Sequence, residues 1–477
     1  MSGRSRRGAV LLLTTLIVTA LIAPPVAQAH GIVGKADLPI PVWLFSWAAA
    51  IVLVVSFVAL STLWQRPQLQ ASEQPGRAVA KLPRAIDWVA GLLGLGLFVL
   101  TVYSGFAGAQ VQTANFANTF VYVVFWVGVP VLSVIFGDVF AAFNPWRAVG
   151  RVVEWLLRSV VRRGGRPLLR YPSWLGLWPA VGGIVGFAWL ELVYVERYEP
   201  EVVAALALAY FGLMIVGMAL FGVEQWCGKG DGFGVYFNLL SRLAPLYRRE
   251  DGSLCVRRPL SGVTDLRVQA GTIVFVCTVI GTTTFDGFSN GGIWRKIEPH
   301  IESWISDLGL SAKPSLELAY SLGLLLCILL ILAIYRIGIA GVRSVNRRYS
   351  TAELSARFAH TLVPIGFAYV LAHYFSLLLW QSQAMGYLIS DPLGNGANIF
   401  GTAGSSIDYH VISYAGIWYV QVAALLLGHV CGLALAHDRA LVLYREPEEA
   451  VRSQYWMLAV MVAFTCFGLY LLSVGGA

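Results

Sequence analysis

Hydrophobic residues in this chain gather into ten long runs that alternate with short polar stretches. Each run has about 20 residues, enough for a helix to cross the ~30 Å hydrocarbon core of a bilayer. The pattern therefore predicts an all-α protein, a polytopic bundle of ten transmembrane helices. The predicted helices cover residues 41–64, 85–107, 118–141, 174–195, 202–224, 269–287, 314–334, 358–380, 411–434 and 454–474.

Basic residues alternate from loop to loop. Of the 34 Lys and Arg residues, 26 lie in five of the polar stretches, whereas the stretches between them hold only five. Cationic loops are retained in the cytoplasm. We therefore expect these five loops on the cytoplasmic side of a bacterial plasma membrane and both mature termini on the outer side. The formal net charge of +8 follows from this topology and calls for no nucleic-acid partner. The basic loops are 65–84, 142–173, 225–268, 335–357 and 435–453.

The first residues have the features of a secretory leader. Three arginines within the first seven residues precede an apolar core (9–23), and Ala27 and Ala29 form a small-x-small cleavage site. We expect a cleaved signal peptide over residues 1–29 and a single polytopic membrane domain over residues 30–477. The alternative is an uncleaved first helix, which leaves the other crossings unchanged.

Two further stretches predict amphipathic helices that lie on the membrane surface. In residues 144–163 charged side chains recur every three or four positions, opposite an apolar face. Residues 297–308 carry a second apolar stripe, on the side expected outside. Both patterns are typical of interfacial helices.

Polar side chains inside the apolar runs are the candidates for function, because each is costly in hydrocarbon and seldom idle. Asp286 and His373 are titratable and fall in the outer half of the predicted bundle. We expect them to act as a catalytic pair in an outward-facing pocket, and the alternative is simple hydrogen bonding between helices. Polar residues on the same helical faces, expected to bind a ligand there, are Thr282, Tyr369, Ser376, Tyr414 and Gln421.

A long loop follows the predicted helix that carries His373. Residues 381–410 contain no Lys or Arg, but they include Asp391, Asp408 and His410. These side chains, with His30 at the expected mature N-terminus, are suitable ligands for a divalent metal. The alternative is a solvated loop in which the Asp side chains cap turns.

Several short motifs resemble those of one known group. They are Gly137-Asp138-Val139-Phe140, Asn144-Pro145-Trp146-Arg147, residues 283–289, Ala359-His360-Thr361-Leu362-Val363-Pro364, Ala372-His373-Tyr374-Phe375-Ser376, residues 390–394, residues 400–404, Gly428-His429-Val430 and residues 436–440. Through them the chain resembles, over nearly its whole length, bacterial multi-pass membrane proteins catalogued as fenitrothion hydrolases. The resemblance implies a membrane-bound organophosphorus hydrolase that cleaves a lipophilic phosphotriester. It supplies no catalytic residues.

Two other classes of function fit the same residues. A transporter or channel for a small solute or metal ion would use the polar faces as its path, with His360 and His429 extending it inward. A membrane scaffold or assembly protein would use them to bind its neighbours. Continuity of polar groups across the bilayer distinguishes the two: a pocket open on one side favours an enzyme, whereas a path open to both sides favours transport.

Overall fold

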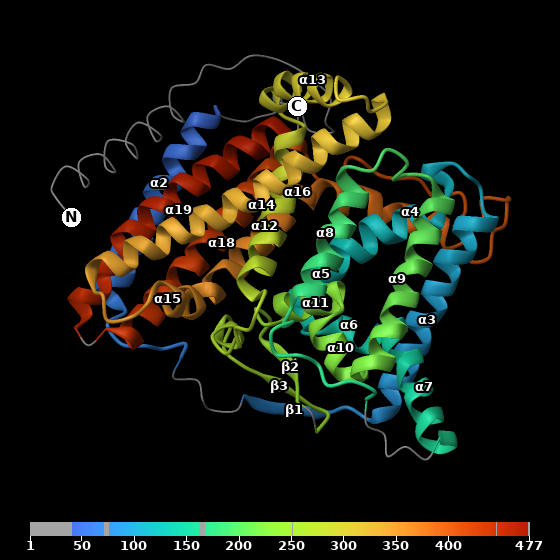
Figure 1. The fold of residues 1–477 in the computed structure, drawn as a ribbon, viewed down its shortest axis with the longest axis horizontal. Coiled ribbons are helices and arrows are strands. Elements are labelled where there is room, and N and C mark those ends of the chain that lie inside the picture. Colours follow the sequence, from blue (N-terminus) through green and yellow to red (C-terminus); the bar gives the residue numbers. More distant parts are fainter. Residues whose placement is uncertain (1–40, 71–75, 162–166, 250, 445, 476–477) are drawn as a thin grey trace.

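A computed structural model describes residues 41–70, 76–161, 167–249, 251–444 and 446–475. Within these ranges the chain forms a bundle of long helices, with very little strand (Figure 1). The protein is an all-α multi-pass membrane protein, as the apolar runs predict. The helices that match the ten predicted runs are α2 (Val42–Leu63), α3 (Arg84–Ala107), the continuous set α4 (Phe116–Thr119), η3 (Phe120–Gly128) and α5 (Val129–Phe136), α8 (Trp178–Leu192), α9 (Pro200–Phe221), α12 (Thr272–Ser289), α14 (Ala312–Val345), α16 (Leu362–Gln381), α18 (Tyr414–Leu443) and α19 (Pro447–Gly475).

The fourth predicted crossing differs from the others. Within the described ranges nine helical spans are long and apolar enough to cross a membrane, but α8 has only 15 residues. At 1.5 Å per residue this is about 22 Å, less than the thickness of the hydrocarbon core. The rest of the predicted run 174–195 forms turns at both ends of α8. The regular helix in this run therefore falls short of a full crossing.

The bundle has two groups of helices that meet at α12 and α16. One apolar core joins α2, α14, α18 and α19, and a second joins η3, α8, α9 and a short helix, α11 (Gly232–Ser241). Side chains of α12 and α16 belong to both cores. The first group lies on the left of Figure 1 and the second on the right. Any group that α12 and α16 carry between them is held by both halves of the molecule.

A small sheet marks one end of the bundle. Strand β3 (Ser253–Val256) lies between β1 (Arg77–Lys81) and β2 (Leu246–Arg248), antiparallel to both. We call this the sheet end. The opposite end carries helix α13 (Gly292–Ser306) and is called the α13 end (Figure 1).

Helix α11 is a feature that the hydrophobic pattern does not predict. It follows α10 (Val223–Lys229) in the stretch 225–268, which was expected to be a loop, yet nearly all of its residues are buried. It packs against α5, α8 and α16, so it enters the bundle from the sheet end. Asp231 holds its start: its carboxylate accepts hydrogen bonds from the Phe233 N–H, the Tyr210 hydroxyl and the Trp146 indole at 3.1, 2.8 and 2.6 Å.

Both predicted amphipathic stretches are helical. Helix α7 (Pro145–Val161) packs across α3 and α9 at the sheet end, and α13 packs on α14. On α13, Ile305 is buried while Trp304 and Ile297 remain exposed. Both helices thus have a face fixed to the bundle, as an interfacial helix requires.

Candidate functional site: a carboxylate–histidine cluster between α8, α12 and α16

Asp286 and His373 form a pair inside the bundle. Asp286 lies in the last turn of α12 and His373 in the middle of α16. The His373 Nε2 atom is 2.8 Å from the Asp286 Oδ2 atom. The side chains are 18% exposed for His373 and 15% for Asp286, so the pair is sheltered but reachable. A carboxylate at this depth needs a partner, and His373 provides one.

The threonines before Asp286 form hydrogen bonds within α12 and do not line a site. The hydroxyls of Thr282 and Thr283 both donate to the Val279 carbonyl, at 3.1 and 3.2 Å. The Thr284 hydroxyl donates to the Ile280 carbonyl at 2.8 Å. Such bonds to the preceding turn satisfy a hydroxyl within its own helix. The donor of Thr282, predicted to bind a ligand, is thus engaged inside α12.

A second carboxylate joins the pair from α8. Glu191 is an electrostatic neighbour of Asp286, and the Tyr374 side chain lies beside both carboxylates. The Tyr374 ring also meets the His373 ring edge to face, with centroids 4.8 Å apart. Arg197, in the turn after α8, is a more distant positive charge that acts on both acids. We refer to Glu191, Asp286, His373 and Tyr374 as the acid–histidine cluster.

Two aromatic residues continue from this cluster toward the sheet end. Trp126 lies beside Glu191 and belongs to η3, a π-helical stretch, a rare conformation that frequently occurs at functional sites. Its ring is 5.3 Å from that of Tyr236 on α11. Tyr236 is fully buried, and its hydroxyl has no hydrogen-bond partner among the described residues. A buried hydroxyl without a partner is costly, and Glu191 is an electrostatic neighbour of Tyr236.

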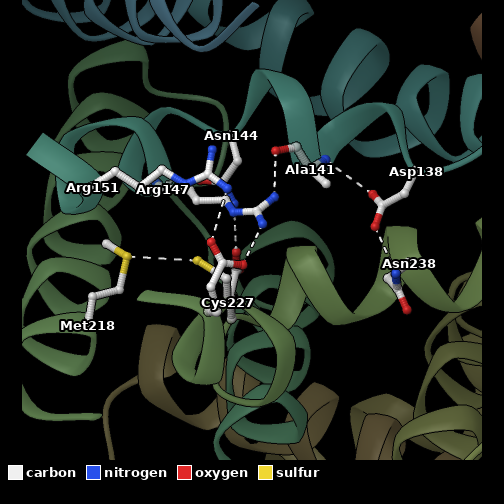
Figure 2. Close-up of polar contacts among 10 residues, drawn as sticks. Asp138, Ala141, Asn144, Arg147, Arg151, Met218, Cys227 and Asn238 are labelled. Carbon is white, nitrogen blue, oxygen red and sulfur yellow. Dashed lines mark hydrogen bonds and ion pairs between the residues drawn. The ribbon is translucent and has the colours of Figure 1, made fainter. Parts of the chain in front are cut away.

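A polar cavity reaches α12 from the sheet end. It has a volume of about 290 Å³, and its walls include Asn238 of α11 and Phe275 and Val276 of α12. Arg147 and Glu224 also line it, and we call this part its mouth. Glu224 is bound there by Arg147 at 2.5 Å and by the neighbouring Arg151 at 3.0 Å (Figure 2). Helix α11 therefore adjoins this cavity through Asn238 and the acid–histidine cluster through Tyr236.

Charged groups at this mouth have shifted acidities. Burial raises the pKa of Asp138, although Asn238 donates a hydrogen bond to its carboxylate at 2.7 Å (Figure 2). For Glu224 burial acts in the same direction, but Arg147 and Arg151 outweigh it and hold the pKa of this carboxyl below its ordinary value. The mouth of the cavity is accordingly rich in ionic contacts.

The cavity and the acid–histidine cluster approach the same helix from opposite ends. From Val276 at the cavity to Asp286 at the cluster there are ten residues, about 15 Å along a helix axis. The intervening part of α12 is buried, and Thr278 within it has a hydroxyl without a hydrogen-bond partner in the described ranges. Polar groups thus approach the centre of the bundle from both ends. We call the buried part of α12 between Val276 and Asp286 the packed interval.

The other residues predicted to bind a ligand do not gather at the cluster. Tyr369 is buried and donates its hydroxyl to the Phe464 carbonyl at 3.1 Å. Ser376 is half-buried one turn beyond His373, and Gln421 is buried on α18. Tyr414 begins α18 and is 43% exposed. The aligned polar faces on three helices therefore do not make one shared wall.

Two of the predicted metal ligands lie together, with the His410 Nδ1 atom 3.6 Å from the Asp408 Oδ1 atom, but no third joins them in the described ranges. The Asp391 carboxylate accepts the backbone N–H groups of Asn395 and Gly396, at 3.0 and 2.8 Å, so it caps a turn. Asp408 and His410 have largely exposed side chains, 62% and 98%. Across the described ranges no three His, Cys, Asp or Glu side chains are grouped as a metal site would require. His30 and the expected signal peptide lie outside the described residues.

Glu191 and Tyr236 were missed by the sequence pattern for different reasons. Glu191 is the only charged residue in the apolar run 174–195, so the rule that selected Asp286 also applies to it. Tyr236 belongs to a stretch that reads as a basic loop, and no periodicity placed it inside the bundle. Only the packing of α11 brings it to the cluster.

Comparison with known proteins adds no assignment, since no protein-family model, curated protein or solved structure matches the chain. The fold and site together define a class: a multi-pass membrane protein with ionisable groups inside its bundle.

Proposed function

We propose that the protein is a transporter for a small solute in a bacterial plasma membrane, and that proton exchange at the acid–histidine cluster accompanies transport. The bias of basic residues supports a cytoplasmic sheet end and an external α13 end. The observation that carries the proposal is the approach of polar groups to α12 from both ends, with about 15 Å of packed helix between them.

The interruptions of regular helix support the same function. The short α8 ends directly after Glu191, η3 is π-helical beside it, and α11 is a ten-residue helix buried among longer ones. Transporters commonly bind substrates and coupling ions where helices are broken near the middle of the membrane. Here α8 contributes Glu191 to the cluster, η3 lies beside it through Trp126, and α11 contacts Trp126 through Tyr236.

The cluster is chemically suited to exchange a proton. His373, when protonated, and ionised Asp286 form a pair without net charge, held by the 2.8 Å contact. Glu191 is then the group that can gain or lose a proton beside them. Ionisable residues inside transmembrane bundles typically mark proton or ion pathways for this reason.

Accessibility of the packed interval tests the proposal. In a variant that lacks the six native cysteines, Thr278→Cys would be exposed to a methanethiosulfonate reagent that cannot cross the bilayer. Right-side-out and inside-out vesicles would be compared. We expect modification from both sides, since a transporter opens this interval to each side in turn. Thr284→Cys is the matched control on the same helix, because Thr284 is equally buried but lies on a different face of α12 from Thr278, and it should stay unmodified.

Modification from the α13 end alone would define a one-sided pocket and overturn the transport proposal. Protection from both sides would overturn it as well. Tyr236→Cys provides a second position in case the first variant fails to fold. Both positions carry hydroxyls that lack partners in the described structure.

A second candidate is a hydrolase that takes a lipophilic phosphotriester from the outer leaflet. The observation that favours it is the His373–Asp286 contact itself, since an imidazole oriented by a carboxylate is a common general base. His373 would accept a proton from the attacking water, and Asp286 would stabilise the resulting imidazolium.

This candidate is tested directly by incubating the purified protein in detergent with fenitrothion and measuring release of the phenol. Hydrolysis that disappears in His373→Ala but persists in Ser376→Ala would support it. A metal analysis of the same preparation would show whether an ion takes part. Absence of hydrolysis by the folded wild-type protein would exclude this triester as a substrate.

A further inference from the structure

A groove with apolar walls runs between α3 and the interfacial helix α7. It has a volume of about 560 Å³ and is lined by Trp88, Leu92 and Leu95 from α3 and by Val149 and Val152 from α7. Leu92 is 70% exposed and Trp88 is 64% exposed. The groove therefore lies on the outside of the bundle, where an apolar chain can enter from the side.

The groove continues into a basic cavity at the sheet end. This cavity has a volume of about 900 Å³ and shares Asp87, Ala141, Arg147 and Arg151 with the groove. Its lining contains seven Lys and Arg side chains and three Asp side chains, an excess of four positive charges. An apolar space and a strongly cationic space are thus joined end to end.

The cations where the two spaces meet are not fully neutralised. Arg147 and Arg151 share one carboxylate, that of Glu224 (Figure 2). Arg242 lines the cavity beyond them, and its guanidinium donates no hydrogen bond to any described residue. Burial lowers the pKa of Arg242, with Asp265 and Asp138 as its nearest opposing charges. A guanidinium with free donors is well suited to bind phosphate.

We propose that the groove and the cavity together bind one anionic phospholipid of the adjacent leaflet. Its acyl chain lies along Leu92 and Leu95, and its phosphate lies against Arg147 and Arg151. Arg242 donates a hydrogen bond to a further oxygen of the headgroup. The apolar groove favours a lipid over a free phosphate anion, because a free anion would leave the groove empty. The proposal does not depend on the transport function.

Native mass spectrometry of the full chain in mild detergent tests this site. Phosphatidylglycerol and phosphatidylcholine with the same acyl chains are titrated in parallel. We expect tighter binding of phosphatidylglycerol, and about a fivefold loss of its affinity in Arg151→Gln, since one basic residue near a membrane surface contributes roughly that factor. Arg258→Gln is the control, because Arg258 is exposed in the same part of the chain and lines neither space.

The groove is tested with Leu92→Trp, whose larger side chain narrows it where the acyl chain would lie. Leu93→Trp is the matched control, since Leu93 is 55% exposed and lies outside the groove. We expect loss of bound phosphatidylglycerol only in Leu92→Trp, at a melting temperature equal to that of Leu93→Trp. Because Leu92 is at the surface, the substitution leaves the core intact.

Three results would overturn the proposal. The first is equal affinity for the two lipids. The second is retention of phosphatidylglycerol in Leu92→Trp. The third is binding of glycerol 3-phosphate that matches the lipid in strength and is unaffected by Leu92→Trp, which would define a site for a soluble phosphate instead.

Discussion

Glu191 and Asp286 come from different helices, α8 and α12, yet their carboxylates are electrostatic neighbours with the Tyr374 side chain beside both. Like charges so close repel one another, so the arrangement is stable only with a compensating group. His373 binds Asp286 directly. The stability of the bundle and the charge of this cluster should therefore be coupled.

That coupling can be measured with a double-mutant cycle. His373→Ala leaves the Asp286 carboxylate without its partner, whereas His373→Ala combined with Asp286→Asn removes the charge as well. We expect the single substitution to lower the melting temperature more than the double one, with an interaction energy of about 1–3 kcal/mol. Ser376→Ala, one turn along α16, is the control. Strictly additive effects would show that the two side chains do not stabilise each other.

Asp231 offers a second test, at the start of α11. Its carboxylate is fully buried and accepts hydrogen bonds from Trp146, Tyr210 and the Phe233 N–H. Asp231→Ala leaves these donors unpaired and should cost more than about 3 kcal/mol. The yield of monodisperse protein in fluorescence-detected size-exclusion chromatography should fall sharply. The exposed Asp251→Ala should behave like the wild type, and an unchanged Asp231→Ala would refute the assigned role.

Glu224 should make stability dependent on pH. Burial tends to raise the pKa of Glu224, but the contacts with Arg147 and Arg151 hold it below its ordinary value of 4.5. A group with a lowered pKa in the folded state stabilises the fold above its unfolded pKa, and that contribution is lost as the pH falls through the folded pKa.

Melting temperatures measured from about pH 3 to pH 7 would reveal this contribution. Glu224→Gln should melt below the wild type at neutral pH, and the difference should shrink in acid. Glu448→Gln is a suitable comparison, because the Glu448 side chain is 88% exposed. A difference that grows as the pH falls would contradict the expected sign.

Labelling with an impermeant maleimide would establish the orientation of the bundle. Asn395→Cys, in the exposed loop at the α13 end, should react in intact cells. Asp251→Cys, next to β3 at the sheet end, should react only after the cells are opened. The basis is the concentration of basic residues at the sheet end. The reverse pattern would invert the topology.

The apolar runs predicted the helices well because length and composition alone decide whether a helix can cross a bilayer. The contact between Asp286 and His373 was expected for a similar reason, since charges in hydrocarbon must find partners. In the predicted loop site, local structure engages one of the acids: the Asp391 carboxylate accepts two backbone N–H groups. The spacing of residues in the sequence does not show whether a carboxylate binds nearby backbone groups or a ligand.

The hydrophobic pattern does not predict helix α11, because this helix has only ten residues. Nothing in a run of that length distinguishes a buried helix from an apolar part of a loop. The packing of α11 depends on α5, α8 and α16, which are distant in the sequence. The position of Tyr236 is therefore a property of the assembled bundle.

This has a consequence for biogenesis. A segment as short as α11 cannot enter the membrane as an independent span, and its polar backbone ends tolerate hydrocarbon only when covered by protein. Helix α16, one of its packing partners, is synthesised more than a hundred residues later. Because α5 and α8 precede α11 in the chain, α11 can pack on them first, and its packing is completed only after α16 has been inserted.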